Sequence, residues 1–158
     1  MEERRVLLRG GLPTALLPLP PYFKKLTDFS KCLRCEDHPC VSACEEKIIE
    51  LKEGFPFLNF AKSGCTFCDK CAEVCPEEVL SVEAKRQKIG EVVVDPNVCI
   101  AWKGVVCFSC QDVCEEGAIE FTRGMFNPII LSEKCTGCGF CISVCPEPAA
   151  LPFFPTEK

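Results

Sequence analysis

The sequence predicts a small α+β fold made of two tandem modules, in which short strands and helices surround groups of cysteines. Three observations support this prediction. Sixteen of the 158 residues are cysteines, they fall into four groups of four, and part of the pattern recurs after a shift of 70 residues. Because cysteine makes up about a tenth of the chain, we expect cysteine rather than a large apolar interior to determine the fold.

The four groups use every cysteine of the chain. They are Cys32, Cys35, Cys40 and Cys44; Cys65, Cys68, Cys71 and Cys75; Cys99, Cys107, Cys110 and Cys114; and Cys135, Cys138, Cys141 and Cys145. A 70-residue shift places Cys40 on Cys110 and the group at 65–75 on the group at 135–145 without a gap. Gly54 then matches Gly124. The sequence therefore predicts one unit with two cysteine sites, present twice.

Short strands are expected after the fourth cysteine of each group, following a helix-like turn. Gly54 and Gly124 lie where hairpins must turn, and the chain then returns to the next group. The charged stretch 82–90 separates the two halves. The strand-like runs lie at 48–51, 55–60, 78–80, 91–96, 118–121, 127–132 and 149–154. We therefore predict an irregular arm over 1–30, a first module over 31–84 and a second module over 91–154.

The groups at 65–75 and 135–145 share a spacing that is diagnostic of a metal cluster. Both read C-x2-C-x2-C-x3-C-P, the run in which bacterial ferredoxins bind [4Fe-4S] clusters and the fourth cysteine ligates the neighbouring cluster. Gly137 and Gly139 help such a loop turn, and Pro76 and Pro146 end it. The sequence therefore predicts a ferredoxin-like protein with four [4Fe-4S] clusters, whose ligands are all sixteen cysteines.

The other two groups are looser, with extra residues at 36–39 and 100–106 and Glu in place of Pro after the fourth cysteine. These residues are expected to bulge, because the cubane dictates the positions of the thiolates. The bulges are either tolerated insertions or segments that contact a partner or change solvent exposure.

Two patterns of ligand sharing are open. In the tandem pattern the first and second groups share ligands: Cys75 joins Cys32, Cys35 and Cys40, and Cys44 joins Cys65, Cys68 and Cys71. In the second half, Cys145 joins Cys99, Cys107 and Cys110, and Cys114 joins Cys135, Cys138 and Cys141. In the nested pattern the first group pairs with the fourth and the second with the third. Linkers of 20, 23 and 20 residues favour the tandem pattern slightly.

Zinc and disulfides are the competing uses of so many cysteines. Zinc sites use two cysteine pairs separated by a longer stretch, whereas four cysteines here crowd into short loops. Disulfides need an oxidising compartment. Arg4 and Arg5 are similar to a twin-arginine export signal, but the stretch 10–21 contains four prolines and no small-residue cleavage site.

Residues outside the cysteine groups suggest no catalytic machinery. We interpret His38 as an exposed loop residue, and Trp102 and the phenylalanines as apolar packing that keeps water from the clusters. No acid–base pair, nucleophile, phosphate loop or run long enough to span a membrane is present, so an independent enzyme is not expected. The net charge is −5, and −8 without the basic first 31 residues, which argues against nucleic-acid binding.

The order of these segments resembles the NapF-type ferredoxins of the periplasmic nitrate reductase system. The resemblance covers residues 30 to 147, and the run CIAWKGVVCFSCQDVCEEGAIEF is its most distinctive part. It implies four [4Fe-4S] clusters on the sixteen cysteines, a cytoplasmic location despite the double arginine, and direct contact with the molybdenum-containing catalytic subunit before its export. The longer CEDHPC loop is similar to that of the related NapG and MauM ferredoxins, which are exported.

Two functions from different classes follow from the resemblance. The first is an accessory ferredoxin that assists maturation of the nitrate reductase catalytic subunit. The second is an electron-transfer polyferredoxin subunit of a membrane-linked or periplasmic oxidoreductase. An interaction scaffold with purely structural clusters is a third interpretation.

Overall fold

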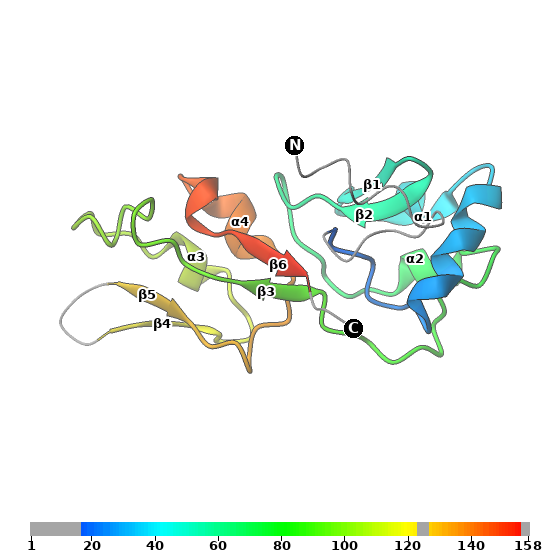
Figure 1. Cartoon of the computed structure of the whole chain (residues 1–158). Coiled ribbons are helices and arrows are strands. Elements are labelled where there is room, and N and C mark those ends of the chain that lie inside the picture. Colours follow the sequence, from blue (N-terminus) through cyan, green and yellow to red (C-terminus); the bar gives the residue numbers. More distant parts are fainter. Residues whose placement is uncertain (1–16, 123–126, 156–158) are drawn as a thin grey trace.

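The computed structural model describes residues 17–122 and 127–155, and these form two similar halves that lie side by side (Figure 1). Each half contains, in order, a short helix, a two-stranded hairpin and a second short helix. In the first half these are α1 (Pro39–Ala43), β1 (Ile49–Lys52), β2 (Phe55–Leu58) and α2 (Lys70–Glu73). In the second they are α3 (Ser109–Asp112), β4 (Ile119–Phe121), β5 (Pro128–Ile130) and α4 (Phe140–Val144). The structure is therefore a small α+β fold, as predicted.

The first hairpin turns where the sequence indicated. Strands β1 and β2 are antiparallel with Ile49 opposite Leu58, and Glu53 and Gly54 form the turn with positive φ angles of 53° and 84°. Two successive positive φ angles are typical of the tight turns that match the twist of a hairpin. The second hairpin pairs Ile119 with Ile130, and Gly124 lies outside the described residues.

A third pair of strands joins the two ends of the second half. Strand β3 (Gly90–Val92) is antiparallel to β6 (Phe153–Pro155), which follows the 3-10 helix η2 (Pro148–Ala150). In the first half, Phe23 and Leu80 form a single antiparallel bridge at the corresponding place. The strand expected over 78–80 is therefore reduced to one bridge, and the strand expected over 149–154 begins only at Phe153.

The described part of the N-terminal arm packs into the first half and is not wholly irregular. Residues 26–30, expected to lack regular structure, begin the 3-10 helix η1 (Leu26–Arg34). Before it, the Leu58 N–H donates to the Pro18 carbonyl and the Ser81 N–H to the Tyr22 carbonyl. Carbonyl groups of the arm thus accept hydrogen bonds from β2 and from the segment that follows α2. Arg4 and Arg5 lie outside the described residues.

Each half has its own small apolar core. The first is centred on Phe29, Ile48 and Val79, and the second contains Val92, Ile119 and Leu151. Ile142 and Phe153 pack against both cores, so the apolar contacts continue from one half to the other. Helix α1 packs on α2 and helix α3 on α4. No helix among the residues that the structure describes is long and apolar enough to cross a membrane.

Phe29 is expected to be important for the stability of the first half. Its side chain is fully buried and packs edge-on against Phe23, with ring centroids 5.2 Å apart. Phe29→Ala should lower the free energy of unfolding of the metal-loaded protein by about 3–5 kcal/mol, measured by urea denaturation. Leu33→Ala is the matched control, because Leu33 lies on the same helix and is 55% exposed; its effect should stay within about 0.5 kcal/mol. Equal effects of the two substitutions would contradict this assignment of the core.

Candidate metal centres

The third cysteine of every group lies in a short helix, and the fourth lies at or just after its end. Cys40, Cys71, Cys110 and Cys141 belong to α1, α2, α3 and α4 respectively. The first two cysteines of each group precede the helix. In each half two such helices pack together, which brings the fourth cysteine of one group towards the other group.

The thiols of the first half form two mixed sets. Burial, together with the nearby thiols of Cys75, Cys40 and Cys35, raises the pKa of Cys32 to about 12. Cys75, the last cysteine of the second group, therefore lies with the first three of the first group. We call this set, Cys32, Cys35, Cys40 and Cys75, site 1.

The complementary set contains the last cysteine of the first group. Burial, together with the thiols of Cys65, Cys40, Cys68 and Cys44, raises the pKa of Cys71 to about 12. Burial also raises the pKa of Cys65 to about 11. We call the set Cys44, Cys65, Cys68 and Cys71 site 2.

In the second half, too, each group contributes its fourth cysteine to the set of the other group. Burial raises the pKa of Cys110 to about 11, with contributions from Cys107, Cys145 and Cys99. We call these four residues site 3.

The fourth set contains Cys114, the last cysteine of the third group. The pKa of Cys141 is raised above the ordinary range of a thiol, first by burial and then by Cys138, Cys135, Cys110 and Cys114. We call the set Cys114, Cys135, Cys138 and Cys141 site 4. Cys110 itself belongs to site 3, so its effect shows that sites 3 and 4 are neighbours.

Three of the four sets line hollows of nearly equal size. The hollows contain about 390, 380 and 370 Å³ of space free of protein atoms, part of it open to solvent, at sites 2, 4 and 3 respectively. Each hollow is lined by all four thiols of its set. All sixteen cysteines are unpaired. Among the described residues no three His, Cys, Asp or Glu side chains are close enough to hold a single metal ion. The thiols of sites 2, 3 and 4 are therefore spread around their hollows and do not converge on one point.

The loops of sites 2 and 4 turn through alternate left-handed residues. Gly137 and Gly139 have φ angles of 76° and 84°, as the sequence indicated, and Phe67 and Asp69 adopt φ angles of 55° and 56° at the matching positions. A left-handed conformation costs a residue with a side chain roughly 1–2 kcal/mol. The same loop path is therefore kept in the first half at the expense of backbone strain.

Backbone amides and one buried hydroxyl face the thiols. The Phe67 N–H donates to Cys65 Sγ at 3.4 Å, and the Ala118 N–H donates to Cys114 Sγ at 3.3 Å. The Thr136 hydroxyl, whose residue lines the hollow of site 4, is buried and has no hydrogen-bond partner among the described residues. Such donors favour a thiolate and any negatively charged group in the hollow.

These features fit an iron–sulfur cluster better than an empty cavity. The raised pKa values keep the buried thiols neutral near pH 7, and a metal must displace their protons to bind. Four sulfur ligands around a hollow, with N–H and hydroxyl donors aimed inward, are the donor set that Fe–S clusters require.

The exposure of the four sites differs. Cys68 of site 2 is the one exposed cysteine, and the other fifteen are buried or partly buried. In the loop of site 3, residues 102–106 are all exposed, as expected for a bulge. In the loop of site 1, Glu36 and Asp37 are exposed.

His38 differs from its interpretation as an exposed loop residue. It is partly buried with a φ of 41°, and its Nε2 lies 3.1 Å from both the Cys32 and the Gly54 carbonyl oxygens. Because both partners are acceptors, Nε2 carries the proton and donates to them. His38 therefore ties the loop of site 1 to the turn of the first hairpin, a role that the sequence did not indicate because Gly54 is 16 residues away.

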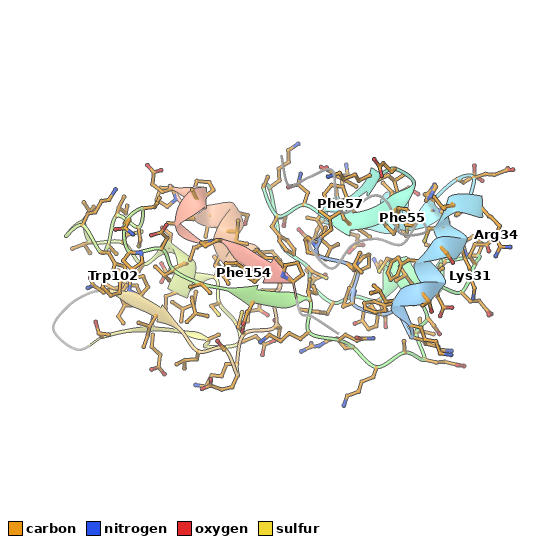
Figure 2. The ribbon with its side chains drawn as sticks, in the orientation of Figure 1. Lys31, Arg34, Phe55, Phe57, Trp102 and Phe154 are labelled. Carbon is orange, nitrogen blue, oxygen red and sulfur yellow. The ribbon has the colours of Figure 1, made fainter. Side chains whose placement is uncertain are left out.

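The aromatic residues match their expected packing role only in part. Phe55 and Phe60 are buried, whereas Trp102 is 37% exposed and its indole N–H donates to the Pro128 carbonyl. Figure 2 shows Trp102 at the outer end of the second half, beside β5, and Phe55 and Phe57 on the first hairpin. Trp102 therefore braces the bulged loop of site 3 against β5 and remains accessible to solvent.

Comparisons with known proteins agree with this description. Residues 103–149 match the family model for the 4Fe-4S dicluster domain. The chain is 36% identical over 153 residues to the ferredoxin-type protein NapF of Escherichia coli K12, an alignment that covers 93% of this chain and 92% of NapF. It is 28% identical to the ferredoxin-type protein NapG of Haemophilus influenzae, over 99% of this chain and 64% of NapG.

A third relative comes from a different system. The chain is 31% identical to the methylamine utilization ferredoxin-type protein MauM of Methylobacillus flagellatus, over 92% of this chain and 71% of MauM. All three relatives are named as ferredoxin-type proteins. The resemblance inferred from the sequence is confirmed: the chain belongs to the NapF family of ferredoxin-type iron–sulfur proteins, related to NapG and MauM.

Proposed function

We propose that the chain binds four [4Fe-4S] clusters, one at each of sites 1 to 4, through all sixteen cysteines. The observation that carries this proposal is that three hollows are each lined by three cysteines of one group and one cysteine of another. Site 1 has the same composition, since Cys75 joins the first three cysteines of the first group. This composition is that of the tandem pattern of ligand sharing, with one two-cluster module in each half.

The polypeptide contributes position, shielding and hydrogen bonds at these sites. The short helices hold the third cysteine of each group and end just before the fourth, and left-handed residues turn the loops of sites 2 and 4 between their first three cysteines. The Phe67 and Ala118 amides donate to sulfur. When bound, [4Fe-4S] clusters supply one-electron redox chemistry, and hydrogen bonds and solvent exposure set their potentials.

The biological function that we propose is that of an accessory ferredoxin of the periplasmic nitrate reductase system. Its partner is the molybdenum-containing catalytic subunit, which it contacts in the cytoplasm and helps to mature before export. The 36% identity to NapF over nearly the whole of both chains supports this assignment.

A second function is supported by a separate observation. The similarity to NapG and MauM, together with the lengthened CEDHPC loop at residues 35–40, favours an electron-transfer subunit of a membrane-linked or periplasmic oxidoreductase. Rapid reoxidation of the reduced protein by a mature terminal reductase would support this function over the first. Proximity of the gene to that of a molybdenum nitrate reductase would support the first.

Ligand sharing predicts for which pairs of cysteine substitutions the losses of bound iron add up. Cys44→Ser and Cys71→Ser affect the same site, so the double variant should lose about one quarter of the bound iron, as each single variant does. Cys40→Ser with Cys44→Ser affects two sites and should lose about one half. Iron and acid-labile sulfide analysis of anaerobically purified protein measures both. If the iron lost in Cys44→Ser instead adds to that lost in Cys71→Ser, and does not add to that lost in Cys40→Ser, ligand sharing between the groups is disproved.

The maturation role predicts a complex with the catalytic subunit that depends on its stage of assembly. Tagged, cluster-loaded protein should retain the unexported catalytic subunit in an anaerobic pull-down and should release it once that subunit is mature. A variant lacking one ligand in each half, Cys71→Ser with Cys141→Ser, serves as a control for dependence on the clusters. Retention of the mature enzyme alone would refute the maturation role and favour electron transfer.

A further inference from the structure

The two halves meet through the cysteine loops of sites 2 and 4. The Cys65 N–H donates to the Cys138 carbonyl oxygen at 2.6 Å. The preceding residue, Gly64, is buried, and a Cβ atom there would lie 2.6 Å from both the Cys138 oxygen and the Phe140 nitrogen. The two loops are therefore in direct backbone contact, with no room for a side chain between them.

Further contacts hold this junction closed. The Ile89 N–H, from the segment that links the halves, donates to the Thr136 carbonyl at 3.0 Å. The rings of Phe60 and Phe153 pack with centroids 5.1 Å apart. Apolar side chains and close backbone contact thus surround the point where the two loops touch, so this part of the boundary between the halves is tightly packed.

Neighbouring sites are in direct contact at three places along the molecule. Helix α1, which carries Cys40 of site 1, packs on α2, which carries Cys71 of site 2, and α3, with Cys110 of site 3, packs on α4, with Cys141 of site 4. Between the halves, the Cys65 N–H of site 2 donates to the Cys138 carbonyl oxygen of site 4. Site 2 thus has a neighbour on each side, and so has site 4.

The outer two sites lie towards opposite ends of the molecule. Lys31 and Arg34, which flank Cys32 of site 1, mark one end in Figure 2, and Trp102, between Cys99 and Cys107 of site 3, marks the other. The spatial order of the sites therefore differs from their order in the sequence.

We propose that sites 1, 2, 4 and 3, in that order, form one continuous electron path, and that the contact of Gly64 and Cys65 with Cys138 joins its two halves. This inference rests on the proposed binding of four clusters. One electron from a one-electron donor, such as a reduced flavin, enters at one outer site. It leaves at the other outer site to an oxidised metal centre of the acceptor. No bond or proton changes, and the chain returns to its starting redox state.

The path is tested by widening the junction. Gly64→Ala and Gly64→Leu insert side chains of increasing size between the loops, and Gly64 has no positive φ that would strain either variant. Both should retain the iron of four clusters. The magnetic interaction between the clusters of the two halves, measured by pulsed EPR on the fully reduced protein, should decrease from wild type to Ala to Leu. Val82→Leu is the control, because the Val82 side chain is 54% exposed and a leucine there adds its bulk at the surface.

A second variant, with two further substitutions, isolates the magnetic interaction across the junction. Cys35→Ser with Cys107→Ser removes one ligand from each outer site, so any magnetic interaction that remains must join sites 2 and 4. It should be present with Gly64 and weakened with Gly64→Leu. Two clusters without any interaction in this variant, or an interaction unchanged by Gly64→Leu, would overturn the path and leave cluster binding intact. A wild-type protein with fewer than four clusters would instead refute the proposed function.

Discussion

The constraint on which the rest of the structure depends is the arrangement of sixteen thiols in four sets, three of which line hollows that the polypeptide itself does not fill. Each half contains only a small apolar core, and three hollows of about 370–390 Å³ adjoin these cores. A chain with apolar cores as small as these needs another source of cohesion, and metal–thiolate bonds provide it. The short helices, hairpins and strained loops all serve to position sulfur atoms.

The two regular loops show how strongly this constraint acts on the backbone. Glycines occupy the left-handed positions in the second half, whereas Phe67 and Asp69 occupy them in the first. Phe67 compensates in part, because its amide donates to Cys65 Sγ and its ring packs under the guanidinium of Arg86, 4.4 Å from the centroid. The geometry of the thiols is therefore maintained even where the local sequence opposes it.

The sequence predicted features that depend on local spacing, and missed those that depend on distant contacts. The hairpin turn at Gly54 and the left-handed glycines of the 135–145 loop follow from residue type. The bridge between Phe23 and Leu80 and the donation from His38 to Gly54 do not, because they join segments that no periodicity connects. The junction between the halves depends on the absence of a side chain at Gly64, whose significance appears only when Cys138 and Phe140 are seen beside it.

The central claim is that thiolate-bound iron, and not the apolar cores alone, maintains the fold. Its most direct test is removal of iron by a chelator under anaerobic, reducing conditions, followed by two-dimensional NMR of the amide groups. We predict that the dispersed spectrum of the loaded protein collapses to that of an unfolded chain and recovers when iron and sulfide are restored. A dispersed, unchanged spectrum after complete loss of iron would contradict the account.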